Sequence, residues 1–165
     1  MSNQKYSSLR IALHWFSALV ILWTLVTGFY RYFFNPQEAF GAWISYVNVS
    51  VTTLLIPLFI WRLALLWISP AASVESRIVH VVHLVIYAVI TLVLVTGVLM
   101  MNKPIEVFNW VTLANPVKDP AWQRIWMQVH IVACGGLAVL VLLHICAVIK
   151  HQLAGRSILR KMWFQ

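Results

Sequence analysis

Charged residues are scarce in this chain of 165 residues, and acidic residues are the scarcest. Only 10% of the residues are Asp, Glu, Lys or Arg, and only four are acidic, whereas about 25% charged residues are usual in soluble domains. A disordered chain is excluded, because disorder depends on low apolar content. Two cysteines are too few for a disulfide-stapled secreted scaffold, and six glycines are too few for a collagen repeat.

Apolar residues make up 62% of the chain, and its mean hydropathy is +0.85. One small core cannot hide that much apolar surface, so a water-soluble globular domain is excluded. A helix needs about 20 apolar residues to cross the hydrocarbon core of a bilayer. Four stretches are long enough, and they cover residues 11–34, 43–68, 78–101 and 125–149. The sequence therefore predicts an all-α transmembrane four-helix bundle, formed by a single domain over residues 1–165.

The net charge of +8 comes from basic residues that lie between the apolar stretches and not along one polar stripe. This distribution is typical of a membrane protein and not of a nucleic-acid-binding protein. One side of the predicted bundle carries eight basic residues and Glu75: Lys5, Arg10, Arg62, Arg77, Lys150, Arg156, Arg160 and Lys161. The other side carries four basic and three acidic residues: Arg31, Lys103, Lys118, Arg124, Glu38, Glu106 and Asp119. The positive-inside rule then predicts that both termini are cytoplasmic.

Six histidines are the most informative feature of the sequence, because ionisable side chains within a membrane are costly and are usually functional. His14 lies about one turn into the first span, and His144 lies a little over one turn from the cytoplasmic end of the fourth. These two spans run in opposite directions, so the two imidazoles reach a similar depth. The others are His80, His83 and His151 on the same side, and His130 near the outer end of the fourth span.

His130 and His144 are 14 residues apart, which is about 21 Å along a helix and roughly 40° in rotation. They therefore lie near one face of the fourth span, at opposite depths of the membrane. Two stacked haems require such an arrangement, since imidazole binds haem iron axially and the porphyrin is apolar enough for a bundle core. Gly135 and Gly136 lie between the two histidines and allow a bulky planar group to approach.

Other interpretations of the histidines stay open at this point. Each one is also explained by a hydrogen bond or by packing within the bundle. A non-haem metal site is less consistent with the sequence, because no carboxylate or cysteine joins the cluster. A proton relay would need acidic partners, and the predicted spans contain no Asp or Glu. Cys134 and Cys146 are about 18 Å apart on a helix, too far for a disulfide, and we interpret both as packing residues.

Three features of the sequence are shared with a known family. They are the segment KYSSLRIALHW at residues 5–15, the run HLVIY at residues 83–87, and the histidine pair of the fourth span. Together they resemble the bacterial cytochrome b561 family, which is related to the b-type cytochrome subunits of membrane hydrogenases and formate dehydrogenases. Members of that family are four-helix bundles of the bacterial inner membrane that hold two b-type haems and exchange electrons with quinone. One member is a superoxide oxidase that reduces ubiquinone.

The resemblance implies particular haem ligands in this chain. His14 and His144 would be the axial ligands of a haem on the cytoplasmic side, and His130 would hold the outer haem. The family's second outer ligand is a histidine near the start of the second span, where this chain has Asn48. An amide is a poor ligand for haem iron. Three outcomes therefore stay open: the outer haem is absent, it is held by His130 alone with an open face near Asn48, or another ligand replaces the histidine.

Further residues have two interpretations each. Arg10 and Arg77 lie at the cytoplasmic edge of the membrane, where they either pair with haem propionates or only set the topology. His83 and His151, together with His80, either line a quinone pocket and transfer protons or, in the case of His83, form a hydrogen bond within the bundle.

The function that the resemblance implies is single-electron transfer between a donor and the quinone pool by a membrane b-type cytochrome with one or two haems. Such a protein would be a haem-dependent oxidoreductase, and superoxide:ubiquinone oxidoreductase is one form of it. The alternatives are a haem-bearing anchor subunit that relays electrons for a partner dehydrogenase, and a mono-haem protein with a structural or sensing role. The expected partners are membrane lipid, quinone and a redox protein, and not nucleic acid.

Overall fold

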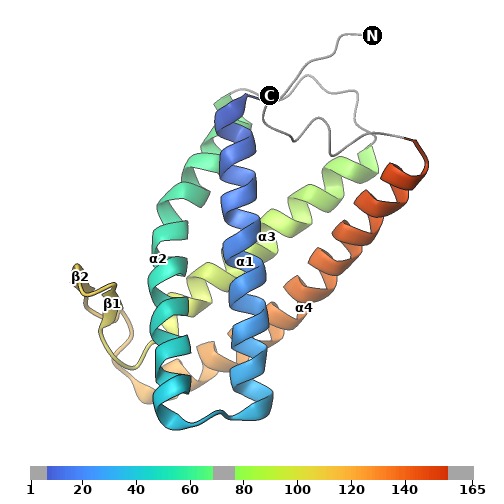
Figure 1. Ribbon diagram of the computed structural model, residues 1–165. Helices are drawn as coiled ribbons and strands as arrows, with labels where there is room; N and C mark the ends of the chain where they lie inside the picture. The colour runs from blue at the N-terminus through green and yellow to red at the C-terminus, as the bar shows by residue number, and fades with distance from the viewer. Residues whose placement is uncertain (1–6, 69–76, 156–165) are drawn as a thin grey trace.

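The computed structural model describes residues 7–68 and 77–155, apart from the side chains of Trp67, Arg77 and Ile78. Four long helices account for most of this part of the chain and confirm the all-α four-helix bundle (Figure 1). They are α1 (Ser8–Phe34), α2 (Glu38–Ile68), α3 (Arg77–Leu99) and α4 (Pro120–Leu153). Each is long and apolar enough to cross a membrane. We call the end where α1 and α3 begin the inner end, following the predicted orientation, and the opposite end the outer end.

Helix α4 is longer than the apolar stretch that predicted it. It begins at Pro120 and not near residue 125, because the Asp119 side chain accepts a 2.7 Å hydrogen bond from the Ala121 amide and caps the helix. Pro120 suits the first helical position, where its missing amide hydrogen costs nothing. With 34 residues, the helix is about 50 Å long, which exceeds the thickness of a bilayer core and requires tilt or protrusion.

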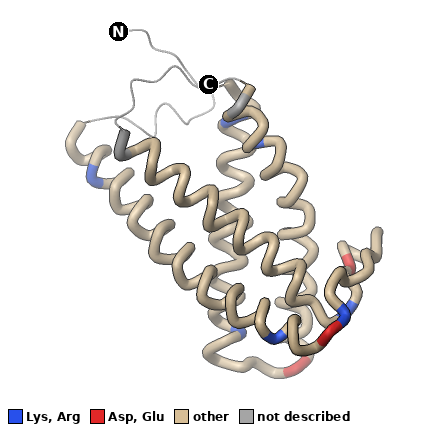
Figure 2. The backbone as a smooth tube through the Cα atoms, turned by 180° about the vertical axis from the view of Figure 1, so that it is seen from behind, with Lys and Arg blue, Asp and Glu red and all other residues tan. Residues whose placement is uncertain are grey.

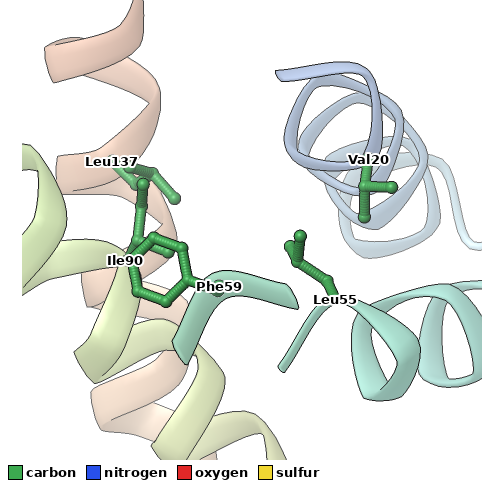
Figure 3. Packing of buried hydrophobic residues seen from close by; sticks show 5 residues of the cluster. All are labelled: Val20, Leu55, Phe59, Ile90 and Leu137. Atoms are coloured by element: carbon green, nitrogen blue, oxygen red, sulfur yellow. The ribbon is translucent and has the colours of Figure 1, made fainter. Parts of the chain in front are cut away.

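The helices associate as two pairs. Helix α1 packs on α2, and α3 packs on α4, whereas the two pairs make few direct backbone contacts with each other (Figure 1). A buried apolar cluster near the middle of the bundle connects them (Figure 3): Val20, Leu55, Phe59, Ile90 and Leu137. We call this cluster the central apolar layer. It contains at least one side chain from every helix, and it divides the interior of the bundle into an inner and an outer half.

A short β-hairpin in the connection between α3 and α4 is not indicated by the apolar pattern of the sequence. Strands β1 (Ile105–Val107) and β2 (Val111–Leu113) pair antiparallel. The first and last residues of β1 are buried against α2, while Glu106 between them is exposed. Ser50 of α2 is fully buried and fixes the hairpin, since its hydroxyl donates to the Glu106 carbonyl and accepts from the Phe108 amide, both at 3.1 Å. The hairpin therefore covers the outer half of α2.

The described acidic residues all lie at the outer end (Figure 2). Glu38 is the first residue of α2, Asp119 caps α4, and Glu106 lies in β1. Arginine and lysine residues occur at both ends of the bundle (Figure 2). Four of the eight basic residues behind the predicted orientation, at positions 5, 156, 160 and 161, lie outside the described residues, so the orientation of the termini stays a prediction.

Candidate cofactor-binding sites

The inner half of the bundle gathers polar side chains from all four helices. Arg62 of α2 donates from Nη2 to Nδ1 of His14 on α1, at 3.0 Å, and to the Tyr87 hydroxyl on α3, at 3.1 Å. The guanidinium also lies over the Tyr87 ring, 5.1 Å from its centroid. On the other helix pair, the His83 and His144 rings of α3 and α4 have centroids 5.7 Å apart. We call these five residues the inner cluster.

The three imidazoles of the inner cluster lie close together. His14 is near enough to both His83 and His144 for charge on one ring to affect the others, and all three side chains are half-buried. His14 therefore reaches the same region of the bundle as His144, although they belong to the first and the last helix. This placement agrees with the matched depth that the sequence predicts for the two residues.

Arg62 is a functional candidate that the sequence interpretation did not single out. It lies six residues before the end of α2, about 9 Å along the helix, and is half-buried. Its described partners are neutral: an imidazole, a phenol and an aromatic face. A cationic side chain inside a span is costly and usually functional. The position of Arg62 within the second predicted span was therefore the signal in the sequence that could have identified it. The cluster therefore carries a positive charge that suits an anionic group, such as a carboxylate.

The other inner residues have separate surroundings. Arg10 donates to the Leu65 carbonyl at 2.8 Å and so ties the start of α1 to the last turn of α2. His80 is exposed, and His151 is half-buried in the last turn of α4. The structure does not connect either of these histidines to the inner cluster through a hydrogen bond between described residues. The side chain of Arg77 lies outside the described part of the chain.

In the outer half, His130 of α4 is held by the backbone and side chains of α3. Its Nδ1 atom lies 3.1 Å from the Val93 carbonyl oxygen and 3.1 Å from the Thr96 hydroxyl oxygen. The Thr96 hydroxyl donates within its own helix, at 2.7 Å to the Leu92 carbonyl, so it accepts from His130. Both neighbours of Nδ1 are therefore acceptors, and Nδ1 carries the proton. The lone pair is then on Nε2, as a neutral histidine needs in order to bind a metal through that atom.

Two smaller contacts complete the surroundings of His130. Gly97 of α3 leaves room for the ring, because a Cβ atom at this position would lie 3.3 Å from His130 Cε1. The Cys134 sulfur, one turn along α4, lies 3.5 Å from Nε2. The thiol is a weak hydrogen-bond donor, and no other described side chain forms a hydrogen bond at Nε2.

Asn48 lies on α2 in the outer half and contacts α1. The Thr27 hydroxyl lies 3.0 Å from Asn48 Oδ1 and 2.7 Å from the Trp23 carbonyl. The single hydrogen of the Thr27 hydroxyl is shared between these two acceptor oxygens, and no described residue engages the amide nitrogen of Asn48. The polar groups of the outer half are therefore one imidazole with a directed lone pair and one amide with available hydrogens.

Regular spacing along the sequence places the polar residues of both halves on the inward faces of α2 and α4. Asn48, Leu55 and Arg62 follow at intervals of seven residues, and so do His130, Leu137 and His144. Seven residues are two helical turns less about 20°, and they advance about 10 Å. The middle residue of each series is buried in the central apolar layer, so the flanking polar residues are directed toward the interior, one into each half.

Imidazoles are the usual protein ligands of b-type haem. The residues present fit haem in the inner half through imidazoles from different helices, and in the outer half through the one imidazole of His130. A Cβ atom added at Gly28 or Gly135 would meet no other atom within 4 Å, so both helices carry open space near the outer half. Gly136 also has open space, but it is exposed. Among the described residues, no three His, Cys, Asp or Glu side chains gather as a non-haem metal site.

A family model described as prokaryotic cytochrome b561 matches residues 5–165, which is nearly the whole chain. No curated protein matches it.

Proposed function

The chain belongs to the prokaryotic cytochrome b561 family, and from this premise we propose that it passes single electrons between a donor and the quinone pool of the bacterial inner membrane. As a member of the family it is a multi-pass membrane b-type cytochrome of electron transfer. The direction of transfer, the quinone and the ligands to haem are parts of the proposal. The observation that carries it is the convergence of His14 and His144, from the first and last helices, on one cluster at the inner end.

His14 and His144 are the residues that would hold an inner haem. A bound b-type haem supplies a one-electron couple whose potential depends on its ligands, its burial and the charge around it. The protein contributes two imidazoles and an interior closed on the outer side by the central apolar layer. Both histidines lie inside helices and not in loops, and helical positions hold ligands more rigidly.

Arg62 is proposed to set the charge near this site. In the structure its guanidinium donates to His14 Nδ1, and arginine has donors only. If His14 held haem iron through Nε2, its proton would be on Nδ1 and Arg62 would no longer donate to that atom. The guanidinium would then be available to an anionic group beside the Tyr87 ring. A nearby positive charge favours the reduced state of the site.

His83 is the proposed proton donor to quinone, and His151 is a second candidate further toward the cytoplasm. Conversion of a quinone to a quinol takes two electrons and two protons, so two successive electrons pass for each quinol formed. A ring nitrogen of His83, next to His144 at 5.7 Å between centroids, is placed to deliver a proton at the site of electron transfer. Imidazole suits this role because it titrates near neutral pH.

Rapid mixing tests this function. The purified protein, reduced with dithionite and freed of excess reductant, is mixed with a short-chain ubiquinone analogue while its absorption bands are followed. We expect oxidation at a rate that rises with quinone concentration. Changing His83→Ala should slow this reaction at least tenfold and leave the absorption spectrum unchanged. If quinone has no effect on the rate of oxidation, the proposed function is wrong.

The electron donor is identified by two parallel experiments. A superoxide:quinone oxidoreductase would be reduced directly by superoxide in the same apparatus. An anchor subunit would instead co-purify with a dehydrogenase under mild detergent conditions.

A further inference from the structure

The outer half of the bundle differs from the inner half in its donor set. The inner half contains three neighbouring imidazoles, whereas His130 is the single histidine of the outer half, since the other five lie toward the inner end. On α4, His130 lies seven residues before Leu137 of the central apolar layer. On α2, Asn48 lies seven residues before Leu55 of the same layer. The outer half therefore combines one imidazole with one amide.

Asn48 and His130 lie at corresponding depths. Both α2 and α4 begin at the outer end (Figure 1), and each of the two residues lies ten positions after the first residue of its helix, about 15 Å along the axis. Asn48 lies on the same inward face of α2 as Leu55, and His130 lies on the same inward face of α4 as Leu137. The two helices thus offer an imidazole and an amide to the same level of the bundle interior.

His130 is already oriented as a ligand. Its Nδ1–H donates to the Val93 carbonyl and to Thr96 of α3, and this hydrogen bonding fixes the ring orientation and the tautomer, as it does for metal-bound histidines generally. Nε2 keeps its lone pair, and among the described residues its one hydrogen-bond partner is the Cys134 thiol, at 3.5 Å. A ligand histidine therefore exists in the outer half even though the second histidine does not.

Asn48 is oriented as a hydrogen-bond donor. Thr27 engages its Oδ1 atom at 3.0 Å, and no described residue accepts from its Nδ2 amide. An amide is a weak ligand for iron, but an N–H group stabilises a bound molecule that has an acceptor atom. Gly28, one residue after Thr27 on α1, has open space where a side chain would begin.

We propose that the outer half binds haem through His130 alone and keeps the opposite axial position for a neutral diatomic gas, which Asn48 stabilises through its Nδ2 amide. The inference depends on the proposed function only in requiring that the protein takes up haem. It adds gas binding to electron transfer, and it assigns the two activities to opposite sides of the central apolar layer. An outer site with two histidine ligands would have no free position for such a ligand.

Carbon monoxide is a suitable probe, because it binds ferrous haem only where an axial position is free. The full-length protein is purified, its haem is counted, and the dithionite-reduced sample is titrated with carbon monoxide. We expect two haems per chain and one bound carbon monoxide, detected as a shift of part of the Soret absorption. The His130→Ala variant should lose one haem per chain together with the carbon monoxide response.

Variants of Asn48 separate its two proposed roles, which are to leave the axial position free and to donate a hydrogen bond to the bound gas. Asn48→His supplies a second imidazole, so the affinity for carbon monoxide should fall at least tenfold at an unchanged haem content. Asn48→Leu removes the donor but leaves the position free, so carbon monoxide should still bind, with a higher C–O stretching frequency. Thr53→Val is the control, because the Thr53 hydroxyl bonds only the Val49 carbonyl of its own helix, and it should behave like the unchanged protein.

Two results would overturn the inference. One is a chain with two haems and no response to carbon monoxide, which would mean that another residue occupies the axial position. The other is a single haem whose amount and spectrum are the same in the His130→Ala variant, which would mean that the outer half holds no haem. In both cases the inner haem and its reaction with quinone would still be observed. Failure of the proposed function would instead appear as loss of that reaction.

Discussion

Arg62 donates a 3.0 Å hydrogen bond from α2 to Nδ1 of His14 on α1. This contact places a permanent positive charge directly beside one of the two proposed inner ligands. It also connects the ligand to α3, because the same nitrogen of Arg62 donates to the Tyr87 hydroxyl at 3.1 Å. The inner cluster is therefore an electrostatic unit as well as a set of ligands, and its charge can be changed by single substitutions.

Arg62→Gln should lower the midpoint potential of the inner haem. Removal of a nearby positive charge favours the oxidised state, and a tenfold change in a one-electron equilibrium corresponds to roughly 60 mV. We expect a decrease of about that size in a spectroelectrochemical titration. Arg62→Lys keeps the charge and should stay close to the unchanged protein. Equal shifts in the two variants would show that the geometry of the guanidinium matters and its charge does not.

Gly97 is expected to tolerate no large side chain. A Cβ atom there would lie 3.3 Å from His130 Cε1, so Gly97→Val should displace the ring from Val93 and destabilise the protein by about 1–3 kcal/mol. Thermal unfolding in detergent, followed by circular dichroism, measures the effect. The control is Gly136→Ala, where an added Cβ meets nothing within 4 Å, and where alanine should stabilise the helix slightly. An unchanged melting temperature for Gly97→Val would contradict the contact.

Ser50→Ala should release the β-hairpin from α2. The substitution leaves the Glu106 carbonyl and the Phe108 amide without their shared partner, at a cost of about 1–3 kcal/mol. Limited proteolysis should then cut within residues 105–113 faster than in the unchanged protein. Ser45→Ala is the matched control on the same helix, because the Ser45 hydroxyl bonds only the Gly41 carbonyl of its own helix. Equal cutting rates in the two variants would mean that Ser50 does not hold the hairpin.

The orientation of the chain is tested with a reporter at its C-terminus. Eight of the twelve basic residues lie on the predicted inner side, which favours cytoplasmic termini. A C-terminal green fluorescent protein should therefore fluoresce, and a C-terminal alkaline phosphatase should be inactive. The reverse pattern would invert the bundle and place the inner cluster on the outside.

The sequence predicted the four helices well because length and apolar content alone decide whether a segment spans a bilayer. It misplaced the start of α4, since Gln123 and Arg124 interrupt the apolar run, whereas the Asp119–Pro120 pair that starts the helix was visible as a capping signal. The hairpin was missed for a different reason. Its turn uses positive φ angles at Phe108 and Asn109, and a phenylalanine gives little indication of that conformation.

The candidate site was predictable only in part. Spacing brought His14 and His144 to one depth, and the structure places both in the inner cluster. The partners of Arg62 and of His130 lie on neighbouring helices, so they depend on how the helices pack, which a single sequence does not show. An arginine near a helix end was interpreted as a topological charge, and its contact with His14 could not be anticipated.

The most direct test of whether His14 and His144 hold the inner haem is the reduced-minus-oxidised absorption spectrum of the purified protein. It is compared with the spectra of the His14→Ala and His144→Ala variants. His151→Ala serves as a control from the last turn of α4. We expect sharp low-spin b-type bands in the unchanged protein and in the control, and loss of the inner-haem component in both ligand variants. A colourless protein after expression with ample haem, or the same low-spin spectrum in all four samples, would contradict this expectation.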